Sequence, residues 1–372
     1  MKAPDKAEML AGIRQWVEIE SHTADASGVN RVMDVCADGW AKAGAKVERI
    51  KGRDGFGDHL SVASPWGGDQ PGILVLCHLD TVHPRGTIKG LPFRVDGDKV
   101  FGPGIYDMKG GAYLAFAAFQ AITRAGKTTP LPLRFLYTSD EEVGSPTSRE
   151  VIVARAKNAK YVLVTEPARD GGRIVTSRKG VARFVLKAHG RPSHAGARHQ
   201  DGRSAILEVA RHVIDIEAMT DYKRGVTFNV GTITGGTAEN VVPAFCEVSI
   251  DMRVKTVADV EAFEAHFRGL KPYNPDVSVQ VTGGLNRPPY EMSPAGAKLY
   301  AHAQKVASGI GIDLVGVATG GGSDGNFTAP LVATLDGLGI DGDGAHTLHE
   351  HMLVSSLEPR MNLHRRLFET LT

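Results

Sequence analysis

The sequence predicts an α/β fold with a mixed, largely parallel sheet, into which a second, α+β domain is inserted. Over the first half of the chain, short apolar runs typical of buried strands alternate with helical patterns. From about residue 177 the strand candidates change to a two-residue alternation, typical of a half-exposed antiparallel sheet. Near residue 289 the helical pattern returns. We therefore expect one domain from residues 1–176 and 289–372, interrupted by an inserted domain over 177–288.

Length and composition agree with two soluble domains. A chain of 372 residues exceeds the size at which a single core usually keeps growing. Its 42% hydrophobic and 23% charged residues fit a globular protein with ample core. The net charge of +1 gives no argument for nucleic acid or an anionic membrane, and no apolar run approaches the roughly 20 residues of a membrane span. We expect no nucleic-acid or membrane partner.

The first 20 residues predict an amphipathic helix and not a signal peptide, because charges interrupt every apolar stretch. The three cysteines, Cys36, Cys77 and Cys246, lack CxxC spacing and are expected to be reduced core residues. Together these two observations favour a cytoplasmic location.

The first domain is expected to begin with helices over residues 4–20 and about 29–44, which have apolar residues at three- and four-residue spacing. Two short strand candidates follow at 47–50 and 59–64. The run from Ile73 to Cys77 then predicts a buried strand, because it is short, rich in branched residues and bounded by Gly72 and a polar cluster.

The same design recurs after that strand. Residues 111–126 are apolar nearly all round, which predicts a helix buried against the sheet. PLRFLYTSDEEVGS predicts another buried strand, which ends at the pair Glu141 and Glu142. YVLVTEP repeats the arrangement, ending at Glu166.

The inserted domain is expected to be a small α+β sandwich of antiparallel strands with two helices on one face. Its predicted strands are KGVARFVLKAHG, TFNVGTITGG, AFCEVSIDMRV and VSVQVTG, and its helices are residues 203–219 and 257–270. The Gly-rich segment GVATGGGSDGN follows in the resumed first domain. It lacks the lysine of a phosphate-binding P-loop, so a nucleotide enzyme is a weak alternative.

Polar side chains that end or flank the buried strands are the candidate functional residues. They are His78, Asp80, Asp107, Glu141, Glu142, Glu166 and His346. Unpaired carboxylates at one edge of a sheet repel each other and lose solvation at considerable cost, which a divalent cation removes. Imidazole nitrogens with carboxylate oxygens suit zinc, with cobalt or manganese as substitutes. The sequence therefore predicts a metal-dependent enzyme.

Seven motifs in order carry a resemblance to a known family. They are HLDTV, GPGIYDMKGG, TSDEEVGS, VTEP, HAG, SDG and GAHTLHE, spread over residues 75–350. In this order they resemble the M20 metallopeptidases, in particular the branch of glutamate carboxypeptidase and carboxypeptidase G2. The resemblance implies a zinc-exopeptidase-like catalytic domain and an inserted lid, or dimerisation, domain.

Position by position, the resemblance implies two zinc ions per subunit. His78 and Glu166 match the ligands of one zinc, and Glu142 and His346 those of the other. Asp107 matches the bridging carboxylate, Asp80 the acid that orients His78, and Glu141 the general base. His349 and His351 remain alternatives to His346, because the closing HTLHEH segment is rich in histidine.

For the inserted domain, the resemblance implies a homodimer and a set of substrate contacts. His194 resembles the lid histidine that stabilises the oxyanion in the other subunit's site. Arg287 resembles the arginine that grips the substrate's terminal carboxylate. Asn240 and Arg253 resemble lid residues near the substrate, and Gly322 lies in the Gly-rich segment expected to line the substrate pocket. For each arginine, a strand-edge salt bridge is the alternative.

The implied activity is hydrolysis of an amide or peptide bond in a small peptide or N-acyl amino acid. The released product would be a C-terminal amino acid, glutamate or a similar residue. Alternatives on the same fold are an N-acyl-amino-acid deacylase, of the acetylornithine deacetylase or succinyl-diaminopimelate desuccinylase type, and a dipeptidase. A metal-dependent binder without activity is a further alternative.

Overall fold

The computed structural model describes residues 2–372, which divide into two units. The first unit contains the residues up to Ser177, together with Glu291–Thr319 and Ser323–Thr372. The second contains Arg178–Tyr290 and Gly320–Gly322. Gly320–Gly322 fall in the first domain by the predicted boundaries, whereas their contacts group them with the second unit.

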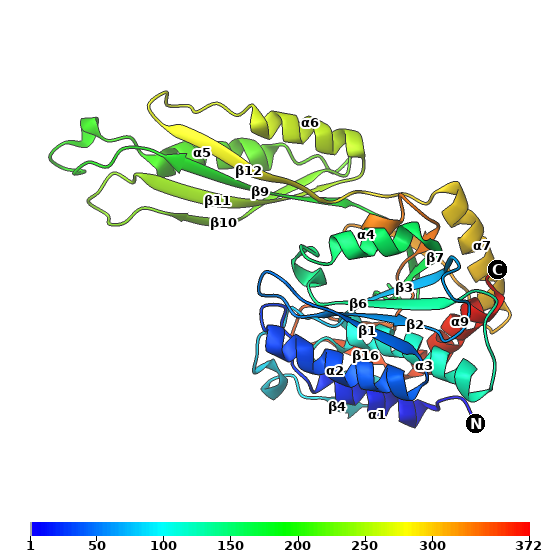
Figure 1. The fold of residues 1–372 in the computed structure, drawn as a ribbon. Helices are drawn as coiled ribbons and strands as arrows, with labels where there is room; N and C mark the ends of the chain where they lie inside the picture. The colour runs from blue at the N-terminus through cyan, green and yellow to red at the C-terminus, as the bar shows by residue number, and fades with distance from the viewer. Residues whose placement is uncertain (1) are drawn as a thin grey trace. The chain divides into compact units, whose positions relative to one another are not determined.

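A six-stranded sheet forms the centre of the first unit (Figure 1). Its strands lie in the order β1-β2-β6-β3-β7-β14, and β6, β3, β7 and β14 run parallel while β1 and β2 are antiparallel. The bounds are β1 Lys46–Ile50, β2 His59–Ala63, β3 Gly72–His78, β6 Leu133–Thr138, β7 Ala159–Val164 and β14 Thr334–Leu335. This arrangement confirms the predicted α/β class with a mixed, largely parallel sheet.

Helices cover both faces of this sheet. Their bounds are α1 Lys6–Val17, α2 Ala26–Lys42, α3 Gly110–Arg124, α4 Arg149–Lys157, α7 Pro294–Ser308, α8 Gly325–Thr328 and α9 Leu357–Thr370. Helix α2 begins three residues before its predicted start because the Asp25 side chain accepts a hydrogen bond from the Gly28 N–H and caps it (3.0 Å).

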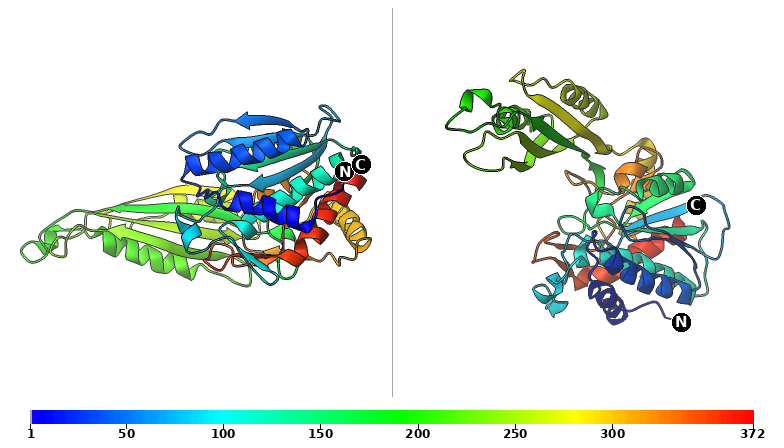
Figure 2. Two further views of the ribbon diagram at one scale, coloured as in Figure 1. Left: turned by 90° about the horizontal axis from the view of Figure 1, so that it is seen from below. Right: turned by 60° about the vertical axis from the view of Figure 1, so that its left-hand side comes forward.

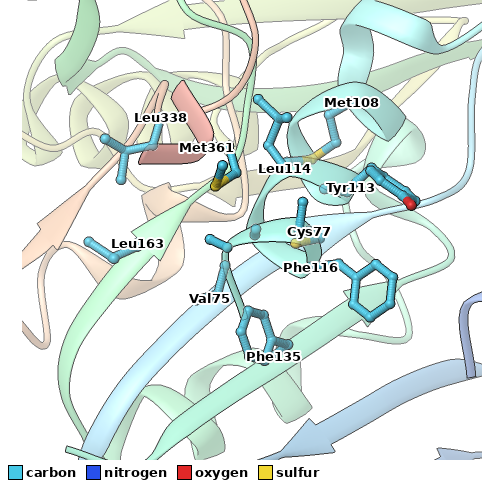
Figure 3. Close-up of a cluster of buried hydrophobic side chains, with 14 of the residues drawn as sticks. Val75, Cys77, Met108, Tyr113, Leu114, Phe116, Phe135, Leu163, Leu338 and Met361 are labelled. Atoms are coloured by element: carbon cyan, nitrogen blue, oxygen red, sulfur yellow. The ribbon is translucent and has the colours of Figure 1, made fainter. Parts of the chain in front are cut away.

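Strand β3 is buried along its whole length and separates two apolar clusters. Ile73, Val75 and Cys77 point into the larger cluster, which contains side chains of α1, α2, α3 and α9. Leu74 and Leu76 point the other way, toward a smaller cluster that includes residues of α4 and α8. Figure 3 shows part of the larger cluster. Burial on both faces explains why the sequence of this strand is continuously apolar.

Two smaller sheets and several short turns complete the first unit. One sheet has the order β15-β16-β5-β4, and the other pairs β13 with β8. The bounds are β4 Arg94–Asp96, β5 Lys99–Phe101, β8 Ile174–Arg178, β13 Gly316–Thr319, β15 Gly342–Asp343 and β16 His351–Leu353. The short helical turns are η1 Thr87–Lys89, η2 Ile105–Lys109, η3 Glu141–Val143 and η5 Val354–Ser356, while η4 His199–Asp201 belongs to the second unit.

The second unit is a four-stranded antiparallel sheet with two helices on one face (Figure 2). The strand order is β10-β11-β9-β12, with bounds β9 Gly180–His189, β10 Thr227–Gly235, β11 Phe245–Val254 and β12 Ser278–Arg287. The helices are α5 Ala205–Ala218 and α6 Val257–Arg268. Alternate residues of β11, from Cys246 to Val254, are buried beneath them, as the predicted two-residue period requires.

All three cysteines are buried and unpaired, as predicted. Among residues 2–372, no helix combines the length and the apolar character that crossing a lipid bilayer requires.

Candidate metal centre

The candidate residues of the first unit follow three neighbouring parallel strands. His78 is the last residue of β3, and Asp80 lies two residues beyond it. Glu141 and Glu142 form a helical turn just after β6, and Glu166 follows β7. Because the carboxyl ends of parallel strands share one edge of the sheet, these side chains converge at the usual position of a site in an α/β fold.

One group of possible ligands consists of His78, Asp107 and Glu166. The His78 Nε2 atom lies 3.2 Å from Asp107 Oδ1 and 3.7 Å from Glu166 Oε1. His78 and Glu166 are almost fully buried, and the Asp107 side chain is 12% exposed. The three donor atoms therefore lie within 4.8 Å of one another in a largely buried position.

A second group consists of Asp107, Glu142 and His346. The His346 Nε2 atom lies 3.3 Å from Asp107 Oδ2 and 3.2 Å from Glu142 Oε2. Asp107 thus turns one carboxylate oxygen toward each group. Within the described part of the chain, His346 is the C-terminal histidine that joins these groups, whereas His349 and His351 do not.

The backbone at two of these residues is unusual. His346 has a positive φ of 65°, a conformation that costs a non-glycine residue of order 1–3 kcal/mol and tends to occur at functional sites. The peptide bond between Asp107 and Met108 is cis.

The electrostatics of the two groups are strongly perturbed. Burial alone would lower the pKa of His78, but its contacts with Asp107 and Asp80 raise it well above the usual histidine range. Contacts with Asp107 and Glu142 raise the pKa of His346 to about 11. Burial would raise the pKa of Asp107, yet His346 and His78 hold it well below its usual range. A cation bound by these side chains would displace the imidazole protons, because metal ligands are deprotonated.

An unpartnered atom provides a direct test of whether a cation fits. Glu142 Oε1 is buried and has no hydrogen-bond partner among the described residues, and burial raises the pKa of this carboxyl. A buried acceptor left without a partner costs roughly 1–3 kcal/mol. A cation between Glu142 and Asp107 would offset this cost, so the donor set fits a divalent metal.

Asp80 is fully buried and connects the two sides of the centre. One of its oxygens lies 3.4 Å from His78 Nδ1, and the Thr23 hydroxyl donates to the other (2.7 Å). Its two oxygens also accept the backbone N–H groups of Glu141 and Glu142, each at 3.2 Å. Asp80 can therefore orient the His78 ring and hold the turn that carries both glutamates.

The candidates of the second unit form two separate pairs. The backbone bridge between His194 and Val241 brings Asn240 beside His194, since the Ala195 N–H donates to the Asn240 carbonyl (2.9 Å). His194 Nδ1 accepts the N–H groups of Gly196 (3.1 Å) and Ala197 (3.2 Å). In the neutral ring the proton must then be on Nε2, which makes His194 a donor.

The other pair consists of Arg287 and Gly322. Arg287 is 3% exposed, and a Cβ atom added at Gly322 would lie 2.8 Å from the Arg287 Cδ atom. Arg253 makes a bidentate ion pair with Asp251 (2.7 and 2.9 Å), and its Nη1 atom donates to the Gly320 carbonyl (3.5 Å), two residues before Gly322.

Sequence reasoning missed two residues that support the centre, Thr23 and Glu350. Thr23 bonds to Asp80 across a separation of 57 residues, and no local pattern signals such a contact. Glu350 is fully buried and accepts the N–H of Asp107 (3.0 Å). Its position at the end of the GAHTLHE motif was the available signal.

Comparison with known proteins agrees with a metal centre in the first unit. Residues 74–370 match the model of Peptidase family M20/M25/M40. Carboxypeptidase G2 from Pseudomonas sp. (strain RS-16) is 29% identical over 378 residues, covering 98% of this chain and 89% of that protein. A succinyl-diaminopimelate desuccinylase from Acinetobacter baylyi is 28% identical over 358 residues, covering 91% and 92%.

Solved structures share the fold over the whole chain. A tripeptidase from Staphylococcus aureus superposes with a TM-score of 0.79 at 19% identity, covering 98% of both chains. An M20 family metallo-carboxypeptidase from Sulfolobus solfataricus gives a TM-score of 0.77 at 15% identity, covering 97% of this chain and 98% of that one.

Proposed function

The chain belongs to peptidase family M20, the metallopeptidases, and from this membership we propose that it uses two zinc ions to hydrolyse an amide or peptide bond. The released product is a C-terminal amino acid, glutamate or a similar residue. The observation that carries the proposal is the position of Asp107, which directs one oxygen to each of the two ligand groups.

In this proposal His78 and Glu166 bind one zinc, Glu142 and His346 bind the other, and Asp107 bridges both. When bound, the ions would make a shared water acidic and polarise the scissile carbonyl. Asp80 keeps the His78 Nε2 atom directed at its zinc, because the opposite ring nitrogen faces Asp80.

Glu141 is the proposed general base. It takes a proton from the attacking water and passes it to the leaving amine. Two features support this role: its backbone N–H is held by Asp80, and it neighbours the ligand Glu142 on the short turn Glu141–Val143. Side chains of adjacent residues on such a turn point in different directions, so one can bind metal while the other accepts a proton.

His194 is proposed to donate a hydrogen bond to the oxyanion in the site of a partner subunit, in a homodimer formed through the second unit. Support comes from the two backbone N–H groups that occupy its Nδ1 atom and leave the proton on Nε2. Such a donor lowers the activation barrier by roughly 3 kcal/mol.

We propose that Arg287 binds the free carboxylate of the substrate, with Gly322 beside it, and that Asn240 and Arg253 flank the substrate. The 29% identity to a carboxypeptidase favours release of a C-terminal residue. The 28% identity to a desuccinylase favours the second candidate, deacylation of an N-acyl amino acid. A dipeptidase is the third. A cytoplasmic location remains a prediction.

A substrate panel with metal analysis tests the reaction. Purified protein is loaded with zinc and assayed on acyl-glutamates, N-succinyl and N-acetyl amino acids, and dipeptides, with and without a chelator. We expect chelator-sensitive hydrolysis, with acyl-glutamates preferred. The Glu141→Ala variant should keep two zincs per chain yet lose nearly all turnover, and an active variant would show that another residue is the base.

Complementation tests the role of His194 in a dimer. The His194→Ala and Glu141→Ala variants should each be nearly inactive alone. Random mixing of their subunits in a two-fold dimer makes about a quarter of the sites complete, so roughly a quarter of wild-type activity should return. No recovery after proven subunit exchange would contradict action across subunits.

A further inference from the structure

We propose that Glu350 is a positioning residue that sets the distance between the Asp107 and His346 ligands. The proposal rests on the two-metal function proposed above. Glu350 lies four residues after His346, immediately before β16, and is fully buried. It is not one of the possible ligands described above.

Four donors converge on the Glu350 carboxylate. Oε1 accepts the N–H groups of Tyr106 (2.9 Å) and Asp107 (3.0 Å). Oε2 accepts the N–H of Gly104 (2.9 Å) and a hydrogen bond from His83 Nε2 (2.5 Å). We call Glu350, His83 and these three N–H groups the Glu350 clamp.

This geometry requires a carboxylate. An ionised carboxylate has about four lone-pair sites and no proton to donate, so it can satisfy all four donors at once. A glutamine of the same shape has one acceptor oxygen, and its NH2 group would face N–H donors. The buried N–H groups left without an acceptor would move or become solvated, at roughly 1–3 kcal/mol each.

The clamp joins three segments that each carry a proposed ligand. His83 lies five residues beyond His78, the Gly104–Asp107 segment carries the bridging carboxylate, and Glu350 itself follows the His346 loop. Strand β16, which begins at His351, also pairs with β5 just before Gly104, so the backbone is held on both sides. A shift of Glu350 would change the spacing of His346 Nε2 and Asp107 Oδ2, now 3.3 Å.

The second unit offers a matched control with a purely structural task. Glu208 is also buried, with 2% exposure, and also pairs with a buried histidine, His212 (3.2 Å). It accepts the backbone N–H groups of Tyr273 (2.6 Å) and Asn274 (3.0 Å). Its segments carry no proposed ligand, so Glu208→Gln should remove similar hydrogen bonds without affecting the metal centre.

The experiment compares Glu350→Gln, Glu208→Gln and wild type, each loaded with Co(II) as the metal probe. For Glu350→Gln we expect kcat to fall roughly 10- to 100-fold with KM nearly unchanged, and the visible Co(II) absorption to change, as for other groups that orient metal ligands. Glu208→Gln should lower Tm while keeping the wild-type kcat and Co(II) spectrum. A wild-type spectrum and kcat in Glu350→Gln, or the same changes in both variants, would overturn the proposal.

Two additions keep the test decisive. If Glu350→Gln does not fold, His83→Leu removes one donor and leaves the three backbone bonds. It should change the Co(II) spectrum in the same direction, and an unchanged spectrum overturns the proposal.

In metal-free protein, amide exchange at Gly104, Tyr106 and Asp107 should be faster in Glu350→Gln than in Glu208→Gln. Equal exchange in the two variants also overturns the proposal. Failure of wild type to bind Co(II) would instead contradict the two-metal function.

Discussion

Buried charged side chains have different partners in the two units. In the second unit Glu208 is hydrogen-bonded to His212 and two backbone N–H groups, and Asp259 is paired with Arg224 and the Thr256 hydroxyl. In the first unit three carboxylates, those of Asp107, Glu142 and Glu166, converge on two imidazoles. One of their oxygens, Glu142 Oε1, has no partner among the described residues.

This contrast teaches what distinguishes a structural charge from a functional one. Burial is similar in both units, so burial alone does not locate the site. The difference is charge compensation: the buried carboxylates of the second unit are paired with the unit's own groups, whereas the carboxylates of the candidate metal centre outnumber their imidazole partners and would be compensated by bound cations.

The largest effect is expected from Asp107→Asn, since Asp107 belongs to both ligand groups. Loss of the bridging charge should reduce kcat/KM by roughly 1,000-fold or more, equivalent to several kcal/mol of transition-state stabilisation. Zinc content should fall below two per chain. The matched variant Asp259→Asn should lower Tm and leave kcat/KM unchanged. A comparable loss of activity in both variants would contradict the distinction between a functional Asp107 and a structural Asp259.

Removing the charge of Glu142 and removing that of Glu208 should change the stability of the metal-free protein in opposite directions. Burial raises the pKa of Glu142, so its charge opposes folding of the metal-free protein above the ordinary glutamate pKa. Because His346 also pairs with Glu142, the test uses a His346→Asn background, in which Glu142→Gln should raise the Tm of the metal-free protein at pH 8. Glu208→Gln should lower its stability by about 1–3 kcal/mol, because backbone donors lose their acceptor. Thermal unfolding in the presence of a chelator measures both, and destabilisation by Glu142→Gln would contradict the account.

The stability of the metal-free protein should depend on pH through His346. The folded pKa of His346 is about 11, above the ordinary histidine value, so its contribution to metal-free stability is complete below about pH 6.5 and lost as the pH rises through 11. His346→Asn should flatten this decline.

The same protons compete with zinc, so calorimetry in buffers of different ionisation enthalpy should detect about one to two protons released on binding. Binding without proton release would argue against His346 as a ligand.

The smallest effect is expected at Gly322. A Cβ there would press on the Arg287 side chain, so Gly322→Ala should raise KM several-fold with little change in kcat, about 1 kcal/mol of binding. Gly311→Ala is a control on an open surface, where a Cβ would meet nothing within 4 Å but the positive φ carries some strain. Equal KM values for Gly322→Ala and wild type would contradict a role of Arg287 in substrate binding.

The sequence was sufficient for the fold class and for the candidates at the strand ends. Strand β3 is apolar on both faces, and a short run with this property predicts a buried parallel strand that ends at His78 and Asp80. Asp107 lies in the short turn η2 and His346 in a loop, and the motif resemblance was needed to select them. Local patterns could not reveal the Glu350 clamp, because its hydrogen bonds join residues more than 240 positions apart. The grouping of Gly320–Gly322 with the second unit is likewise a long-range effect.

Anomalous diffraction at the zinc absorption edge, on crystals of the zinc-loaded protein, tests the central claim most directly. The account predicts two peaks per chain: one bound by His78, Asp107 and Glu166, and the other by Asp107, Glu142 and His346. A single peak, or peaks that Asp107 does not bridge, would contradict it.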